Sequence, residues 1–263
     1  YRVLFNRNIS IFLLMDSLKC LSAECVNLLH KNRLLQTLIK QELKNSLLSE
    51  IQIDKETESK AIQDLKIKFK ITNETDLDKF LIKNGLDNQD FLDLALFPLR
   101  VKKYSTENFQ KKSEARFLER KNQLDIVIYS LLRISDTNLC RELYLKINEK
   151  EVDFGEIASQ YSEGIEKKTR GIVGPIPLEK THPFLAEHLR TSKIGEVSQP
   201  FKLDSYYLVT RLESYDPVQL DSYMKNKMCE ELFELWLNQK SISILNELIT
   251  PLKTNIKSSG EIS

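Results

Sequence analysis

Glycine and proline are scarce in this chain, and their scarcity limits the fold. Each occurs 7 times in 263 residues. Tight turns depend on these two residues, so an all-β fold built from many short strands is disfavoured. Apolar residues make up 41% of the chain, which is enough to build a core. A chain of this length forms one large domain or two ordinary ones.

An excess of charge of one sign is also missing. Lysine and arginine number 39, and aspartate and glutamate number 38, which leaves a net charge of +1. No basic stripe alternates with aromatic residues that could stack on bases. The composition therefore gives no electrostatic reason to expect nucleic acid as a partner. No apolar run approaches the length of a membrane span.

The four cysteines form no CxxC pair. Cys20, Cys25 and His30 follow one another at intervals of five, which turns them to different sides of a helix. Cys140 and Cys229 stand alone. We therefore expect reduced, mostly buried thiols of an intracellular protein, which neither pair in disulfides nor bind a metal or cofactor.

The first residues have two interpretations. Two arginines precede an apolar run from Ile9 to Met15, and Asp16 follows it directly. A truncated signal peptide within residues 1–15 would have this order, although the run is short for one. We favour Met15 as the natural start, which implies a cytoplasmic protein; an exported protein is the alternative.

Residues 15–122 have the periodicity of amphipathic helices. The first long helix begins at the capping residue Ser22. Its apolar stripe comprises Leu28, Leu35, Leu38, Ile39, Leu43 and Leu47. A second helix is predicted over 56–70, a third from the cap Thr75 to Gly85, and a fourth from Asn88. Pro98 should kink or reset the fourth helix.

The pattern changes at residue 123. The apolar run from Ile126 to Leu132 is rich in β-branched residues and predicts a strand buried on both faces. Asp136 and Asp153 are predicted to cap two helices, and Pro183 to begin a third. A last strand follows over 205–214.

From Asp216 to residue 250 the pattern is helical again. Its broad apolar stripe contains Leu220, Met224, Met228, Leu232, Leu235 and Trp236. A lone helix cannot bury such a stripe. We therefore predict that residues 216–250 fold back onto residues 15–122.

Residues 126–214 carry a family resemblance. Their order is strand, helix, helix, glycine turn, short helix and strand. With the segments "FGEIASQYSEG", "RGIVGPIP", "HPFLAEHLRTSKIGEVSQPF" and "YYLVTRLES", this order resembles the parvulin family of peptidyl-prolyl isomerases. The helical parts resemble those of the parvulin-type foldases SurA and PrsA. The whole layout is most similar to cyanobacterial parvulin-type proteins.

The resemblance implies an α+β fold. A helical, chaperone-like domain would comprise residues 15–122 together with the C-terminal helix, residues 216–250. A parvulin-like domain, residues 123–215, would be inserted into it, with an antiparallel sheet surrounded by helices.

The implied activity is rotation about the X–Pro amide of a polypeptide held in a shallow groove. Clients would be unfolded, nascent or exported polypeptides, and an export system is an implied partner. The alternative is a non-catalytic chaperone, or a peptide-binding adaptor on a degenerate parvulin scaffold.

The polar site positions depart from the family pattern. Ser130 and Tyr207 stand where the family has two histidines, so the resemblance assigns catalysis to them. Gly164 stands at the position of a cysteine or aspartate, and Ile172 at the aspartate of the glycine turn. Because Ser130 and Tyr207 both carry hydroxyls, a hydrogen bond between them is expected.

The apolar site positions agree with the family pattern. Val173 and Phe184 match the family's proline pocket, and Arg170 is a candidate rim contact at the end of a solvated loop, residues 166–170. The pocket methionine has no assigned counterpart near Glu179 and Lys180. Ser130, Tyr207 and Phe184 could each also be explained by packing in the core. His182, just before Pro183, is interpreted as a helix cap. The segment "RISDTN" has one arginine, so we expect no preference for phosphorylated substrates.

Overall fold

The computed structural model describes residue 18 and residues 20–258, with side chains up to residue 250. The predicted start at Met15 and the possible signal peptide lie outside the described residues. Two compact units form: Phe117–Leu220 is one, and the chain before and after it makes the other. Although α6 and α10 each have 37 residues, no described helix carries an apolar stretch long enough to cross a membrane.

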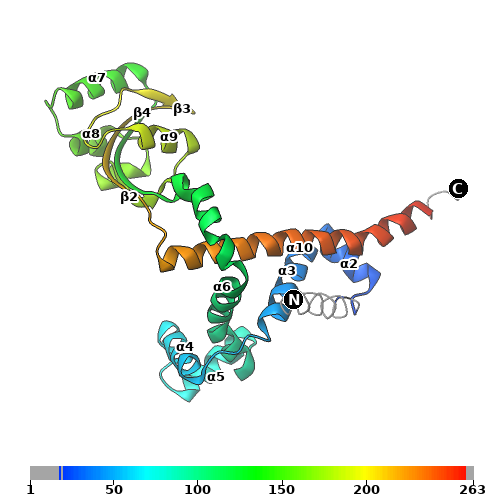
Figure 1. Cartoon of the computed structure of the whole chain (residues 1–263). Coiled ribbons are helices and arrows are strands. Elements are labelled where there is room, and N and C mark those ends of the chain that lie inside the picture. Colours follow the sequence, from blue (N-terminus) through cyan, green and yellow to red (C-terminus); the bar gives the residue numbers. More distant parts are fainter. Residues whose placement is uncertain (1–17, 19, 259–263) are drawn as a thin grey trace. The chain divides into compact units, whose positions relative to one another are not determined.

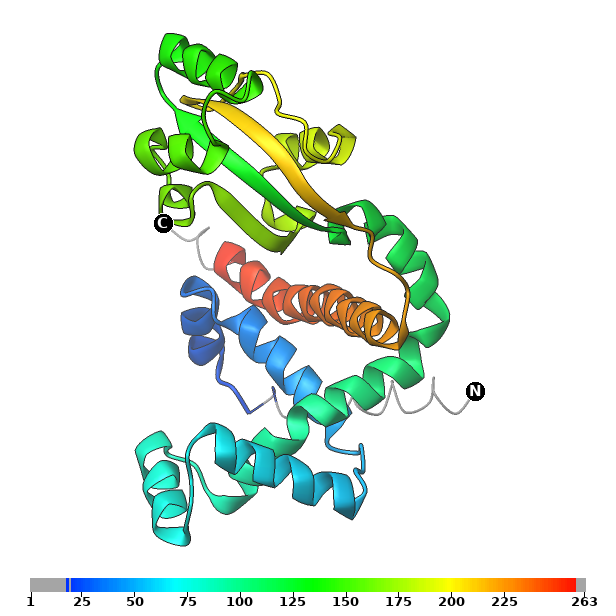
Figure 2. The ribbon, with the colours of Figure 1, turned by 90° about the vertical axis from the view of Figure 1, so that its left-hand side faces the viewer.

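The first unit is helical and uses both ends of the chain (Figure 1). Its helices are α2 (Ala23–Lys31), α3 (Leu35–Leu48), α4 (Lys55–Lys68), α5 (Glu74–Asn84), most of α6 (Asn88–Leu124) and α10 (Ser222–Ser258). Helix α10 lies along α3, as the sequence predicted (Figures 1 and 2). Their shared core includes Ile39 and Leu43 of α3, and Phe233 and Leu237 of α10, all with 0% exposure.

The stripe on α10 is partly different from the one predicted. Phe233 and Leu237 form the buried side, whereas Leu235 is 42% exposed. Phe233 contacts Tyr104 of α6, with ring centroids 4.9 Å apart. The sequence pattern located the helix, but the partners on α3 and α6 determine which of its faces is buried.

The prediction of one long first helix is wrong. Helix α2 ends at Lys31, Arg33 adopts a left-handed backbone with φ of 60°, and α3 starts two residues later. Leu28 is consequently 63% exposed, outside the buried stripe on α3. Ser22 does cap α2, because its hydroxyl accepts a hydrogen bond from the Cys25 amide at 3.2 Å.

The ends of α5 and the course of α6 differ in part from the prediction. Asn73, not Thr75, caps α5, since its side chain accepts from the Asp76 amide at 2.9 Å. Gly85 ends α5 in the left-handed conformation that glycine tolerates, with φ of 63°. Pro98 does not reset α6, which continues to Leu124.

The second unit is an antiparallel sheet with helices around it, so the α+β fold is confirmed. The strands are β1 (Ile126–Ile134), β2 (Ile172–Pro177), β3 (Phe201–Leu203) and β4 (Tyr206–Asp216), in the order β2-β1-β4-β3. The helices are α7 (Thr137–Asn148), α8 (Phe154–Tyr161) and α9 (Pro183–Thr191), with 3-10 turns η1 (Ile165–Thr169) and η2 (Leu178–Lys180). Strands β1 and β4 run side by side through the centre (Figure 2).

The predicted caps in this unit are present. Asp136 accepts hydrogen bonds from the amides of Asn138 and Leu139 at 2.7 and 2.9 Å. Asp153 accepts from the Glu156 amide at 3.1 Å. His182 caps α9 through Nδ1, which accepts from the Phe184 amide at 3.2 Å.

The cysteine prediction is half right. Cys140 and Cys229 are buried, and burial raises the pKa of both thiols, that of Cys140 to about 11. Cys20 and Cys25 are exposed instead. The described residues contain no group of three or more side chains that could hold a metal ion.

Candidate functional site

The two faces of the sheet have separate cores. On one face, which we call the α9 face, Tyr129 and Leu131 of β1 and Leu208 of β4 pack against Leu185 and Leu189 of α9. We call the other face the α8 face. There Leu132, Ile134 and Val209, strand residues that alternate with those of the α9 face, pack against α7 and α8. The helix residues in this core are Cys140, Leu143, Ile147, Phe154, Ile157 and Ala158. Side chains alternate along a strand, so each position belongs to one face.

Ser130 belongs to the α8 face. It pairs with Arg211 across the strands and is 1% exposed. Its hydroxyl donates to the Glu213 carboxylate, which also accepts from Nε of Arg211 at 2.8 Å. The Arg211 guanidinium lies 5.3 Å from the centre of the Phe154 ring. Ser130 is therefore tied into a polar group that includes Arg211, Glu213 and an aromatic ring.

The predicted hydrogen bond between Ser130 and Tyr207 is wrong. Tyr207 pairs with Ile134, four positions from the Ser130–Arg211 pair. At roughly 3.3 Å per residue, the two side chains start about 13 Å apart along the strands. Tyr207 packs against the α8-face core, and Ser130 lies on the same face of the sheet. A catalytic role for either residue stays a prediction.

Val173 and Phe184 lie on the α9 face. Val173 pairs with Tyr129, whereas its neighbour Ile172 pairs with Ser130 and points to the other face. Phe201 packs against the same core as Val173, and its ring centroid is 5.7 Å from that of Phe184. Phe184 is 54% exposed, so it is not a plain core residue.

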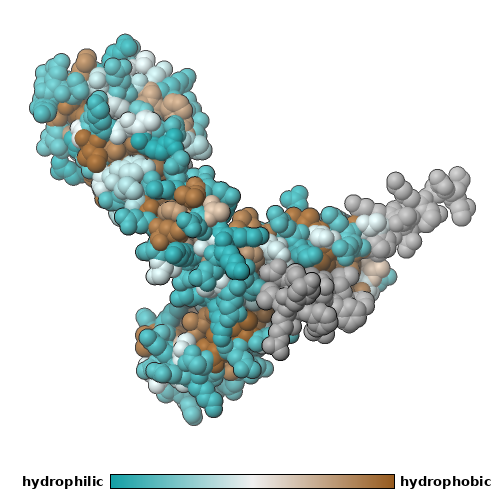
Figure 3. Space-filling model, viewed as in Figure 1, coloured by the Kyte–Doolittle hydropathy of each residue, from teal (hydrophilic) through white to brown (hydrophobic). Residues whose placement is uncertain are grey.

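Phe184 and Phe201 form an aromatic pair at one edge of the sheet, whereas Val173 lies on β2 at the opposite edge. Phe201 also contacts His188, with ring centroids 4.5 Å apart. Nε2 of His188 is buried without a hydrogen-bond partner, and burial lowers the pKa of this imidazole. Figure 3 shows hydrophobic residues, in brown, reaching the surface of this unit among hydrophilic ones.

An ion pair between the half-exposed Arg133 and the buried Glu166, on the α9 face, was missed by sequence reasoning. The Arg133 guanidinium lies 5.7 Å from the centre of the Tyr206 ring, and Nε is 3.4 Å from Oε1 of Glu166. Glu166 is 3% exposed and accepts a 2.7 Å hydrogen bond from the Ser162 hydroxyl. The interpretation of residues 166–170 as a solvated loop is therefore wrong at Glu166.

Arg133 keeps donors for a ligand. Its side chain is 36% exposed, while Nε is buried and makes no hydrogen bond. Within the described residues, its terminal nitrogens have no partner either. The four N–H groups of these terminal nitrogens are therefore available to a ligand.

Tyr129 adds a second donor near this ion pair. It is 4% exposed, and burial raises its pKa to about 12; the Arg133 charge lowers this pKa and the Glu166 charge raises it. The phenol is therefore protonated at neutral pH. Its neighbour Ser130, to which the resemblance assigned catalysis, points to the opposite face.

The glycine at position 164 makes room for Glu166. A Cβ built on Gly164 would lie 2.2 Å and 2.3 Å from the two carboxylate oxygens of Glu166. The carboxylate thus occupies the space that a side chain at position 164 would need. One signal of this arrangement is in the sequence: Gly164 stands at a position where the resemblance implies a polar side chain. A nearby residue, Glu166, supplies the polar group instead.

Arg170, the predicted rim contact, and Glu179, to which no role was assigned, are both held in ion pairs. Arg170 has a left-handed backbone with φ of 55°, and its guanidinium bonds Oδ1 of Asp153 at 3.0 Å beside the start of α8. Glu179, near the missing methionine position, pairs with Arg120 of α6.

A cavity of about 440 Å³ lies on the other side of α9, lined by Thr181, Pro183, Ala186, Glu187 and Arg190 among others.

A comparison of sequences connects the sheet-containing unit with a known family. Residues 135–214 match the family model described as Rotamase: PPIC-type PPIASE domain. No curated protein matches the sequence significantly.

Solved structures of parvulin-type proteins are similar to longer parts of the chain. PrsA from Bacillus anthracis is 18% identical, with 82% of this chain and 97% of that chain covered and a TM-score of 0.43. A SurA-like chaperone of Campylobacter jejuni is 18% identical, with 79% and 92% covered and a TM-score of 0.35. A PpiC-type isomerase domain is 16% identical, with 38% and 99% covered and a TM-score of 0.34.

Proposed function

We propose that the chain is a parvulin-type foldase that isomerises X–Pro bonds in unfolded polypeptides on the α9 face. The observation that carries this proposal is that the α9 face presents the aromatic pair Phe184–Phe201 together with the Arg133 guanidinium, whose terminal nitrogens have no partner among the described residues. The family match of residues 135–214 supports the same reaction class.

The chemistry needs no nucleophile. The barrier to rotation is about 18–20 kcal/mol and comes from conjugation between the amide nitrogen and its carbonyl. When the amide twists, the nitrogen lone pair becomes a hydrogen-bond acceptor. A donor that reaches this lone pair binds the twisted form more tightly than the planar form, and so lowers the barrier.

The α9 face offers both parts of such a catalyst. The aromatic rings of Phe184 and Phe201 would hold the proline ring and exclude water from the amide. The Arg133 guanidinium, held by Glu166 and Tyr206, would donate to the twisted amide, with the Tyr129 phenol as a second donor. In this proposal Ser130 and Tyr207 have a structural role in the sheet and take no part in catalysis.

The chain contains a matched control for Arg133. Arg211 also pairs with a glutamate and lies over an aromatic ring, but on the α8 face. Exchange NMR on an Ala-Pro peptide, with the full chain as catalyst, compares Arg133→Gln and Arg211→Gln. We expect Arg133→Gln to lower kcat/KM by about tenfold or more, because one donor to a developing charge contributes that much or more, and Arg211→Gln to leave it unchanged.

Phe184→Ala should abolish faster exchange and peptide binding together. If Arg133→Gln and Arg211→Gln have equal effects, the assignment of the donor is wrong. If the unaltered chain accelerates no exchange, catalysis itself is refuted.

The second candidate function is a non-catalytic chaperone or peptide-binding adaptor. Ser130 and Tyr207 in place of both family histidines favour it. Under this alternative, Ala-Pro peptide signals shift on addition of the protein without faster exchange, and Phe184→Ala hardly changes the suppression of client aggregation.

Three finer predictions follow from the resemblance alone. The clients would be nascent or exported polypeptides, with an export system as partner. The most similar proteins would be cyanobacterial. The location would be cytoplasmic, or exported if residues 1–15 are a truncated signal peptide. Fractionation of the source cells, with detection of the protein in each compartment, tests the location.

A further inference from the structure

The end of α4 carries lysines that have no acidic partner. Residues 66–73, with the sequence "KIKFKITN", contain three lysines and neither aspartate nor glutamate. Lys66 and Lys68 lie in the last turn of α4, and Lys70 follows that helix with a left-handed backbone, φ of 58°. None of these lysines forms an ion pair or a hydrogen bond within the described residues. We call residues 66–70 the α4 tip.

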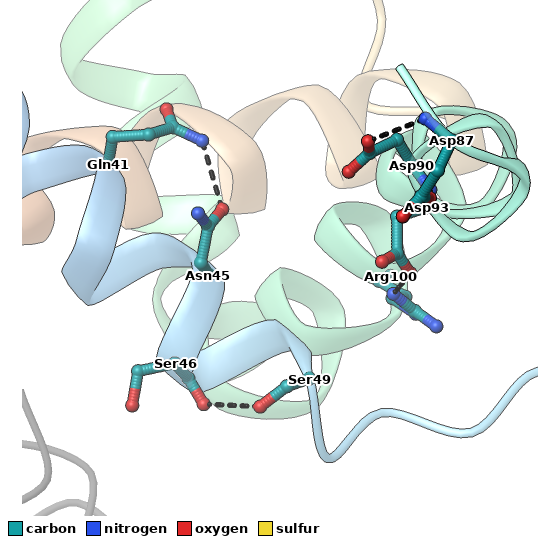
Figure 4. Close-up of polar contacts among 8 residues, drawn as sticks. All are labelled: Gln41, Asn45, Ser46, Ser49, Asp87, Asp90, Asp93 and Arg100. Carbon is teal, nitrogen blue, oxygen red and sulfur yellow. Dashed lines mark hydrogen bonds and ion pairs between the residues drawn. The ribbon is translucent and has the colours of Figure 1, made fainter. Parts of the chain in front are cut away.

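Other basic residues of the helical unit are neutralised by ion pairs. In Figure 4, Arg100 pairs with Asp93 on the same helix, α6, at 2.7 Å. Lys40 and Lys44 of α3 both pair with Glu234 of α10, at 2.9 and 2.6 Å. The α4 tip differs from these groups, because its positive charges have no such partners.

The carboxylates that are nearest in the sequence do not compensate the α4 tip. Neither Asp64 nor Glu74 forms an ion pair with a lysine of the tip among the described residues. The Asp76 carboxylate accepts hydrogen bonds from the hydroxyl and the amide of Thr72 at 2.7 and 3.3 Å. These hydrogen bonds lower the pKa of Asp76, and the cation that lowers it further is Lys79 of α5. The tip therefore keeps a local excess of positive charge.

Apolar side chains are exposed among these lysines. Ile67 is 69% exposed and Phe69 is 40% exposed. The Phe69 ring lies 4.8 Å from the ring of Phe80, and Nζ of Lys68 lies 5.7 Å from the centre of the Phe69 ring. Figure 3 shows hydrophobic residues, in brown, at the surface of the part of this unit that contains α4 and α5.

Stabilisation of α4 explains only part of this arrangement. The C-terminal end of a helix carries a partial negative charge, which Lys66 and Lys68 complement. That role requires neither Lys70, which lies outside the helix, nor the exposure of Ile67 to water. An exposed isoleucine between cations suits a partner that has an anionic layer and an apolar layer together.

A bilayer surface with anionic lipids has both layers. Its phosphates attract lysine side chains, which reach the headgroups while neighbouring apolar residues enter the acyl boundary. Nucleic acid suits the tip less well, because stacking of bases needs a free aromatic face. The Phe69 ring is already in contact with Phe80 and Lys68.

We propose that the α4 tip binds the surface of membranes that contain anionic lipids. Lys66, Lys68 and Lys70 contact the headgroup phosphates, and Ile67 and Phe69 enter the boundary between headgroups and acyl chains. The contact is peripheral and lies entirely within the helical unit. It depends neither on catalysis nor on the α9 face.

Sedimentation of the full chain with lipid vesicles tests the proposal. Vesicles of phosphatidylcholine with one quarter phosphatidylserine are compared with vesicles of phosphatidylcholine alone. We expect binding to the first kind only, and weaker binding as the salt concentration rises, because salt screens exposed charges.

Two lysine variants locate the charged part of the contact. Lys68→Gln/Lys70→Gln should weaken binding by about tenfold or more, because each lysine near an anionic surface contributes roughly fivefold. The matched control Lys55→Gln/Lys60→Gln removes the same charge from the other half of α4, where Glu56 and others supply acidic neighbours. This control should bind almost as the unaltered chain does.

A second pair of variants tests the apolar part. Ile67→Ser should weaken binding by about fivefold or more, because it removes an apolar side chain from the acyl boundary. Leu28→Ser, on α2, changes a residue with a similar exposure of 63% and should have no effect. Circular dichroism checks that each variant is folded.

The outcomes decide between the membrane and other partners. Binding that needs phosphatidylserine and responds to the tip variants but not to their controls supports the proposal. It is overturned if the unaltered chain does not sediment with phosphatidylserine vesicles, or if both lysine variants weaken binding equally. Tighter binding of a short single-stranded oligonucleotide, lost in Lys68→Gln/Lys70→Gln, would assign the tip to nucleic acid and also overturn it.

Discussion

At the residue scale, Glu166 shows how one buried charge organises its neighbours. Its carboxylate accepts from the Ser162 hydroxyl and lies against Nε of Arg133. Burial of a charge is unfavourable unless it is paired and hydrogen-bonded, so these contacts are needed rather than optional. The lack of a side chain at Gly164 leaves the space in which the carboxylate is held.

Gly164→Ala should therefore destabilise the sheet-containing unit, Phe117–Leu220. The new methyl group would displace the Glu166 carboxylate and break its hydrogen bond, at a cost of about 1–3 kcal/mol. Urea unfolding of the full chain, followed by circular dichroism, measures the loss. In a Glu166→Ala background the same change should be nearly neutral, and additive effects of the two changes would contradict the explanation.

His188 gives a pH dependence. Burial lowers the pKa of the folded imidazole below its ordinary value of about 6.5, so the unfolded state binds more protons near that pH. Stability should be complete above about pH 6.5 and fall as the pH drops through the folded pKa. Thermal unfolding between pH 5 and 7.5 should show a smaller slope in His188→Gln. The exposed His30 is the control; if His30→Gln removes the slope equally, burial of His188 is not its cause.

At the element scale, helix starts depend on one side chain each. Asp136 accepts two amide hydrogen bonds at the start of α7, and Asp153 one at the start of α8. Such signals are local, so the sequence located both caps. The break between α2 and α3 and the continuation of α6 through Pro98 are not local, because packing can override backbone preferences.

Asp136→Ala should loosen the start of α7. Loss of an N-cap costs about 0.5–2 kcal/mol, because the amides of Asn138 and Leu139 lose their acceptor. Amide hydrogen exchange of α7 reports this loss directly. Asp136→Asn keeps a side-chain acceptor and should remain close to the unaltered chain; an equally large effect of Asp136→Asn would show that the cap is not responsible.

At the scale of the whole molecule, the two units have separate cores. The core around Phe233 contains residues of α3, α6 and α10, whereas Leu132 belongs to the α8-face core. Trp236 is the single tryptophan of the chain and packs beside Phe233, with ring centroids 6.4 Å apart. Tryptophan fluorescence therefore reports on the helical unit.

Phe233→Ala should lower the free energy of unfolding measured by this fluorescence by about 3–5 kcal/mol, because it leaves a cavity in a closely packed core. Leu132→Ala removes an equally buried side chain from the other unit. It should lower the stability measured by circular dichroism while leaving the fluorescence transition in place. A fluorescence transition that shifts equally in both variants would mean that the units unfold as one.

The sequence alone determined the features that depend on neighbouring residues. The β-branched run of β1, the caps at Asp136 and Asp153, the glycine end of α5 and the helical stripe of α10 all express local preferences or periodicity. The family resemblance added the antiparallel sheet and the apolar positions Val173 and Phe184.

The tertiary structure alone decided which side chains meet. Strand pairing set Ser130 opposite Arg211 and Tyr207 opposite Ile134, and so prevented the hydroxyl bridge that sequence position suggested. The fold also brought Glu166 to Arg133 across 33 positions of the sequence (166 − 133 = 33). A side chain's face follows from strand register and from the path of distant loops, and neither is encoded in the residues beside it.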